Sequence, residues 1–198
     1  QVGEGNLFLL LGLTAVICII LGMGMPTTAI YFLLAVLATQ PLIDLGVEPL
    51  SAHLFVLYFG LMSMISPPVA LAAFTAAKLS ETPPMATAWA ACRFGWPAFI
   101  VPFLFVIAPN LIMVGSALDI ALTFVTAVAG IWIASAGFTG YFLTRLNMTH
   151  RIIYIVGGFF LLLPTEAFEG AVALQVAGAI LSGAGLAWEL KLRRQVAT

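Results

Sequence analysis

Two short motifs in the first third of the chain contain the residues best suited to binding a solute or an ion. The first motif, Gly22–Thr28 with the sequence GMGMPTT, interrupts the apolar run Leu7–Ala38. Pro26 suits the first turn of a new helix, because its missing N–H would have no partner there anyway. Thr27 and Thr28 then bring two hydroxyl groups to the positive end of that helix, which favours an anionic group.

The second motif, Ser63–Pro68 with the sequence SMISPP, interrupts the apolar run Ala52–Leu79. We expect Pro67 and Pro68 to begin a second half-helix, with Ser66 directly before it. Two interrupted apolar runs that follow each other closely in sequence indicate the binding site of a secondary transporter. An alternative is that each motif is a simple kink, since Gly and Pro are frequent in membrane helices.

The chemistry that these motifs predict is the joint binding of a carboxylate and a hard cation. Backbone carbonyls of the unwound segments can coordinate Na⁺, which makes Gly22 and Gly24 candidate ligands in the first motif. Hydroxyl groups and helix ends would hold the carboxylate, because no strongly apolar stretch of the first hundred residues contains an internal carboxylate or cation. The candidate substrate-binding residues are Thr27, Thr28, Ser66 and Pro67.

The composition is that of an all-α integral membrane protein. Of the 198 residues, 63% are hydrophobic and only 8% are charged, and the mean hydropathy is +1.16. A soluble domain is typically about 25% charged. The net charge of −1 indicates nothing about partners, no basic stripe suggests nucleic acid, and the apolar composition points to membrane lipid as the surrounding medium. We expect a helical bundle with a re-entrant hairpin and a broken transmembrane helix, followed by further membrane helices.

The run Leu7–Ala38 has two interpretations. Its arms of roughly 16 and 12 residues would be about 24 and 18 Å long as helices. Neither arm spans the roughly 30 Å hydrocarbon core alone. The run is therefore either a re-entrant hairpin with its tip at Gly22–Pro26 or a single broken crossing helix. The Gly-x-Gly-x-Pro spacing favours the hairpin, because it reverses a chain more easily than it continues a helix.

Loop charges predict the orientation of the chain. The segment Arg145–Arg151 carries two arginines and a histidine, and the tail carries Lys191, Arg193 and Arg194. The positive-inside rule places both in the cytoplasm. Asp44 and Glu48 then lie outside, and Glu166 lies at the membrane interface. We therefore expect a multi-pass protein of the cell inner membrane with a cytoplasmic C-terminus.

Two regions are expected along the chain. Residues 1–114 contain the hairpin 7–38, the broken helix 52–79, an interfacial arm 85–95 and a helix 97–114. Residues 115–198 form a C-terminal extension of about three membrane helices.

Four segments resemble the large permease subunit of tripartite ATP-independent periplasmic (TRAP) transporters. They are Leu21–Ala29, Gly46–Gly60, Ser66–Phe74 and Phe99–Phe103, and the similarity covers roughly Leu7–Leu111. The chain looks most like the C-terminal half of the fused small-plus-large permeases that work with TAXI-type binding proteins.

The resemblance implies an elevator mechanism built from two inverted repeats, of which this chain holds the second. It implies Na⁺-coupled uptake of a small organic anion that a periplasmic substrate-binding protein delivers, with Na⁺ as coupling ion and no cofactor. By motif position, the backbone of Ser63, Ile65 and Pro68 would bind Na⁺, although many relatives have Gly at the position of Ser63. Because one repeat alone could not transport, the rest of the permease, including the first inverted repeat, is an expected partner, and the chain is expected to be part of a longer protein.

Other functions remain as alternatives. An intramembrane enzyme lacks support, because neither a Gly-x-Ser-x-Gly nor a His-Glu-x-x-His motif occurs. A non-transporting membrane anchor or assembly subunit would tolerate substitution of the Gly and Pro residues. Another carboxylate transporter family of similar architecture is a closer alternative.

Overall fold

The computed structural model describes residues 7–165 and 170–196, with side chains described as far as Glu189. All regular elements within these ranges are helices, which confirms the expected all-α class. Three helical stretches in these ranges are long and apolar enough to cross a membrane, namely Pro84–Ile107, which comprises two helices in succession, Ala117–Thr139 and Ala171–Glu189. Contacts divide the chain into two compact units, Gln1–Ile112 (unit 1) and Met113–Thr198 (unit 2), which are described separately.

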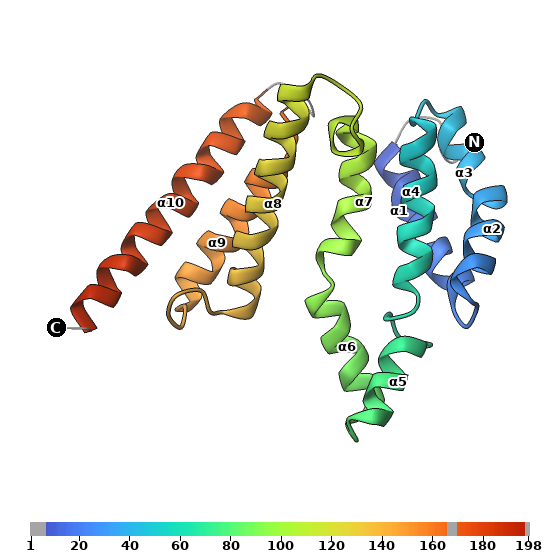
Figure 1. Cartoon of the computed structure of the whole chain (residues 1–198), viewed down its shortest axis with the longest axis horizontal. Helices are drawn as coiled ribbons and strands as arrows, with labels where there is room; N and C mark the ends of the chain where they lie inside the picture. The colour runs from blue at the N-terminus through green and yellow to red at the C-terminus, as the bar shows by residue number, and fades with distance from the viewer. Residues whose placement is uncertain (1–6, 166–169, 197–198) are drawn as a thin grey trace. The chain divides into compact units, whose positions relative to one another are not determined.

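Unit 1 is organised around one helix, α4, against which α1, α2 and α7 pack (Figure 1). Its elements are α1 (Leu7–Gly22), α2 (Thr27–Leu37), α3 (Thr39–Asp44), α4 (Pro49–Met62), α5 (Leu71–Leu79), α6 (Pro84–Phe94), α7 (Pro97–Ile107) and a short 3₁₀ helix, Pro109–Ile112. The chain reverses direction between α1 and α2, so these two helices form a hairpin whose arms both lie on α4 (Figure 1).

The core of unit 1 is apolar and lies where these helices meet. Leu11 of α1, Leu34 of α2 and Phe55 of α4 are fully buried in one cluster. The Phe55 ring lies 4.8 Å from the Phe59 ring and 5.3 Å from the Phe103 ring of α7. Tilted and edge-on aromatic contacts of this kind add to the burial of apolar area, so they fix α4 and α7 side by side.

A capped start and a long-range hydrogen bond fix the upper part of α4. The Glu48 carboxylate accepts a hydrogen bond from the Ser51 N–H at 2.9 Å, and Pro49 occupies the first turn. The Ser51 hydroxyl donates to the Phe105 carbonyl of α7 at 2.7 Å. A regular helix would pair that carbonyl with the N–H of residue 109, which is proline and has none. The serine therefore satisfies an acceptor that Pro109 leaves unpaired.

The segment between α4 and α7 has different bounds from those expected. α5 and α6 pack on each other through Ala70, Ala73 and Ala88. The helix expected over 97–114 ends at Ile107, because Pro109 begins a separate 3₁₀ turn. The expected arm 85–95 corresponds to α6, which is separated from α7 by Gly95 and Trp96.

Unit 2 contains three helices, with α9 packed against both of the others. They are α8 (Ala117–Thr139), α9 (Met148–Leu162) and α10 (Ala171–Val196). Glycines allow the backbones to approach closely: a Cβ on Gly158 would lie 2.6 Å from the Ala134 nitrogen, and one on Gly178 would lie 2.8 Å from the Gly157 oxygen. Small residues serve membrane helices in this way.

A side chain of α9 binds the end of α8, where the connection between the two helices begins. The Arg151 guanidinium donates to the carbonyls of Gly137 and Phe138, each at 3.1 Å, and so caps the negative end of α8.

Glu166, which was expected at the membrane interface, lies outside the described residues. The side chains of Lys191, Arg193 and Arg194, on which the cytoplasmic assignment of the tail depends, also lie outside them.

Candidate functional site

The first motif forms the tip of the α1–α2 hairpin. α1 ends at Gly22, and α2 begins at Thr27 after Pro26, whose φ of −63° and ψ of 147° are extended. Gly24 has φ +80°, a left-handed conformation that glycine adopts without strain. The sequence predicts Pro26 in the first turn of a new helix; in the structure it is the N-cap residue, one position before the first helical residue.

The second motif lies between α4 and α5, but it does not begin a helix. α4 ends at Met62 and α5 begins at Leu71, so the expectation that Pro67 and Pro68 begin the second half-helix is wrong. These two prolines lie in a non-helical connection and are joined by a cis peptide bond. α5 begins later than expected for a local reason. The Ala72 N–H pairs with the Met64 carbonyl at 3.0 Å and so folds the connection back on itself.

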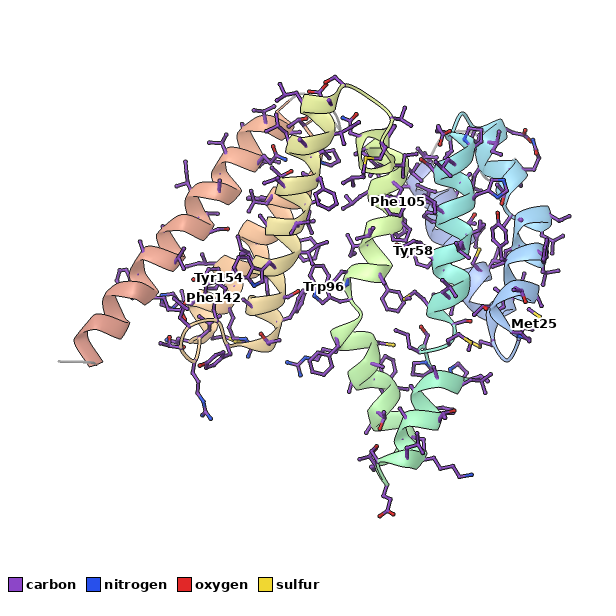
Figure 2. All side chains as sticks on the ribbon, in the orientation of Figure 1. Met25, Tyr58, Trp96, Phe105, Phe142 and Tyr154 are labelled. Carbon is purple, nitrogen blue, oxygen red and sulfur yellow. The ribbon has the colours of Figure 1, made fainter. Side chains whose placement is uncertain are left out.

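The two interruptions meet in space. A Cβ on Gly22 would lie 2.7 Å from the Ser63 hydroxyl oxygen and 3.0 Å from the Gly60 carbonyl oxygen. Real Cβ atoms do not approach that closely, so this contact requires glycine at position 22. The hairpin tip therefore abuts the end of α4, backbone against backbone. Met25, labelled at the tip in Figure 2, is partly buried against the core cluster of unit 1.

The serine hydroxyls of the second motif are already engaged. Ser63 donates to the Gly60 carbonyl at 2.6 Å and Ser66 donates to the Met62 carbonyl at 2.7 Å, and both residues are buried. Each proton is thus turned back onto the end of α4, and only oxygen lone pairs remain for a ligand. Thr27 and Thr28 differ, because both are exposed at the start of α2.

Backbone carbonyls of the second interruption fall into two groups. Those of Met64 and Val69 accept hydrogen bonds from backbone N–H groups. Those of Ser63 and Pro68 accept none from the part of the chain that the structure describes. Two of the three expected carbonyl ligands for Na⁺ therefore keep both lone pairs available.

The third expected carbonyl, that of Ile65, has a partner that sequence reasoning missed. The Cys92 thiol of α6 donates to it at 3.4 Å. The Ile65 side chain also lies against the gap between α6 and α7, since a Cβ on Gly95 would lie 3.1 Å from its Cδ1 atom. No local spacing in the sequence indicates this contact across 27 residues.

The two half-helix starts offer different numbers of free N–H groups. No side chain caps α2, and its first backbone bond runs from the Ile30 N–H to the Pro26 carbonyl at 3.0 Å. At α5, the N–H groups of Leu71 and Ala72 are already paired. The start of α2 is therefore the more open positive helix end. Among the described residues, no group of three or more His, Cys, Asp or Glu side chains could hold a metal ion, so a cation here depends on carbonyl and hydroxyl oxygens.

Comparison with known proteins identifies a family for the part of the chain that holds both interruptions. Residues 1–120 match the family model described as the tripartite ATP-independent periplasmic transporter, DctM component. Neither a curated protein nor a solved structure matches the chain. The matched segment covers more than half of the chain and includes both interruptions, and on this ground the chain belongs to the DctM family of transporter permeases.

Proposed function

We propose that unit 1 is the second transport repeat of a permease that couples the uptake of a small organic anion, a carboxylate, to Na⁺ by an elevator mechanism. The family is one of transporter components, which separates the chain from the enzymes considered above. The single observation that carries the proposal is the contact of Gly22 with Gly60 and Ser63. It brings two non-helical segments, which are distant in sequence, to one place inside an apolar unit.

The cation half of the proposed site consists of backbone oxygens. Non-helical backbone at membrane depth is tolerated where it is buried in protein or lines a polar cavity. The carbonyls of Ser63 and Pro68 on one side, and of Gly22 and Gly24 on the other, are the proposed ligands. Ile65 remains a candidate because a carbonyl has two lone pairs and the Cys92 thiol, a weak donor, occupies only one of them.

The anion half of the proposed site is the start of α2. Thr27 and Thr28 supply exposed hydroxyls and N–H groups there. Ser66 and Pro67 of the second interruption offer no donor to an anion in this arrangement, because the hydroxyl and the N–H of Ser66 both donate to the Met62 carbonyl and proline has no N–H. A helix N-terminus contributes at most about 2 kcal/mol to binding a charge. A millimolar site requires about 4 kcal/mol. The remaining affinity comes from groups outside this unit, and we assign it to the first inverted repeat of the same permease.

The proposed setting is the inner membrane, with a periplasmic substrate-binding protein delivering the anion and a small permease subunit completing the transporter. Unit 2 is proposed as the C-terminal extension of the fused type of permease. A non-transporting anchor remains the second candidate. It predicts that the contact at Gly22 has no effect on uptake.

The first test compares two Gly-to-Ala substitutions in α1 of the full-length permease. Gly22→Ala adds a Cβ that meets Ser63 and Gly60, whereas a Cβ on Gly12 would meet nothing within 4 Å. We expect Gly22→Ala to raise the Na⁺ concentration for half-maximal uptake by roughly tenfold, equivalent to about 1.4 kcal/mol, and Gly12→Ala to leave it unchanged. Uptake into proteoliposomes at varied Na⁺ provides the measurement. Equal Na⁺ dependence in both variants would favour the anchor.

The second test separates the anion from the cation. Thr27→Val keeps the shape of the side chain and removes one hydroxyl at the start of α2. We expect a several-fold rise in the KM for the anion with little change in Na⁺ dependence. Pro68→Ala should change the Na⁺ dependence and leave the KM for the anion nearly unchanged, because it relaxes the backbone that presents a proposed Na⁺ ligand. If the two variants shift the same parameter equally, the assignment of separate halves fails.

A further inference from the structure

Unit 2 contains a large apolar groove that the transport proposal does not use. Its volume is about 880 Å³, and α8, α9, α10 and the connection after α8 all contribute to its lining. Trp132, Phe142, Leu161, Ala179 and Gly183 are among the lining residues. Phe142 and Tyr154, labelled in Figure 2, lie together at the end of the groove nearest the α8–α9 connection, with their rings 5.8 Å apart.

The size of the groove decides what fits it. A helix about 10 Å across occupies roughly 80 Å² in cross-section, so the volume of about 880 Å³ would hold roughly 11 Å of helix, or about two turns. A membrane-spanning helix must cover roughly 30 Å. A single hydrocarbon chain is much thinner and can lie along the apolar lining. The groove is therefore too small to enclose a membrane-spanning helix, whereas an acyl chain can lie within it along its length.

One end of the groove carries exposed positive charge. Tyr141, Phe142 and Leu143 line the groove, and Arg145 pairs with Tyr141 in an antiparallel bridge within the same tight turn. Arg145 is exposed. The carboxylate of Glu189 is also at this end, but it is buried and accepts hydrogen bonds from Leu143, Thr144 and Tyr154.

The groove end that carries Arg145 is lined by side chains of the kind found at the membrane interface. Tyr141 and Trp132 both line the groove and are 58% and 65% exposed. Amphipathic rings of this kind are enriched at the level of lipid headgroups. Basic groups between membrane helices bind anionic headgroups. The arrangement thus places a charge complementary to a phosphate next to an apolar channel.

We propose that this groove binds one anionic phospholipid, with an acyl chain between α8 and α10 and the phosphate at Arg145. The proposal concerns unit 2 alone and is independent of the transport function of unit 1. The chain would therefore carry a bound lipid through purification. That lipid would fill the space that the three helices leave between them.

A substitution that fills the groove provides the test. Gly183 lines the groove, and a Cβ built on it meets nothing within 4 Å, so Gly183→Leu should be accommodated while occupying the channel. Gly12→Leu is the matched control, because Gly12 is also in open space and lies in unit 1. Native mass spectrometry of the full permease, purified in mild detergent after exchange into phosphatidylglycerol, gives the number of retained lipids. We expect Gly183→Leu to lower the lipid-bound fraction at least fivefold and Gly12→Leu to leave it unchanged.

A second variant tests the headgroup. Arg145→Gln should retain a lipid but lose the preference for phosphatidylglycerol over phosphatidylcholine. Equal lipid retention in Gly183→Leu and the unsubstituted protein would overturn the proposal, and would mean that protein covers the groove. An unchanged headgroup preference in Arg145→Gln would overturn the assignment of the phosphate to this arginine. Circular dichroism and gel filtration verify that each variant is folded.

Discussion

At the scale of single residues, two serines of unit 1 donate to backbone carbonyls near the points where helices end. Ser51 supplies the donor that Pro109 cannot give to the Phe105 carbonyl. Ser66 adds a third donor to the Met62 carbonyl at the end of α4, which also accepts from the N–H groups of Ile65 and Ser66. An unsatisfied buried acceptor costs about 1–3 kcal/mol, so Ser51 stabilises the irregular backbone.

Ser51→Ala should therefore destabilise unit 1. Ser51 is fully buried, and its loss leaves the Phe105 carbonyl without a donor. We expect a loss of about 1–3 kcal/mol in the free energy of unfolding, measured by denaturation in mixed micelles. Thr75→Ala is the control, because the Thr75 hydroxyl is exposed and bonds only to its own helix at Leu71. A loss of the same size in both variants would mean that the contact between α4 and α7 contributes nothing specific.

The sequence predicts the candidate site in part. Gly and Pro punctuate apolar runs strongly, so Gly22–Pro26 and Ser63–Pro68 are readily identified as interruptions. The start of α5 at Leu71 is not predictable in this way, because it depends on the pairing of Ala72 with Met64. The contact of Gly22 with Ser63 and that of Cys92 with Ile65 depend on how the helices pack, which local patterns do not encode.

At the scale of elements, the side chain of Glu189 connects α10 to the rest of unit 2 through hydrogen bonds. Glu189 of α10 accepts hydrogen bonds from the backbone of Leu143 at 3.1 Å and of Thr144 at 2.8 Å, from the Thr144 hydroxyl at 2.9 Å and from the Tyr154 hydroxyl at 3.1 Å. The first three converge on one carboxylate oxygen. α10 is thereby tied to the connection between α8 and α9.

Glu189→Ala and Glu189→Gln should differ clearly. Alanine leaves the donors of Leu143, Thr144 and Tyr154 without their acceptor, and we expect a loss of about 3 kcal/mol or more, since hydrogen bonds to charged groups contribute about 1.5–3 kcal/mol each. Glutamine keeps one oxygen for Leu143 and Thr144, and its nitrogen can face Tyr154, whose hydroxyl also accepts. Thermal unfolding in detergent should rank the two variants in that order. Equal unfolding temperatures would show that these hydrogen bonds do not hold α10.

At the scale of the molecule, the charges at the ends of the units predict how the chain lies in the membrane. In unit 1, α3 with Asp44 lies at one end and the connection between α5 and α6 lies at the other (Figure 1). In unit 2, Arg145 is exposed in the connection after α8. Cations mark the cytoplasmic side, so Asp44 is expected outside and Arg145 inside.

Cysteine labelling tests this orientation. In a background with Cys92 replaced by alanine, only the buried Cys18 remains of the native thiols. We expect Asp44→Cys to react with a membrane-impermeant maleimide in intact spheroplasts and Arg145→Cys to react only after permeabilisation. The opposite pattern would reverse the orientation and with it the assignment of a cytoplasmic C-terminus.

The glycine at the hairpin tip has a mechanical consequence. Since position 22 has no side chain, α1 meets the junction with α4 through its main chain, and Ser63 is the side chain that faces it from α4. A ligand that enters the junction would therefore meet the main chain of α1 directly, and we expect its binding to displace the end of α1 relative to α4. Distance measurements between spin labels on α1 and α4 would record that displacement. The measured mobility of side chains near the tip would change little.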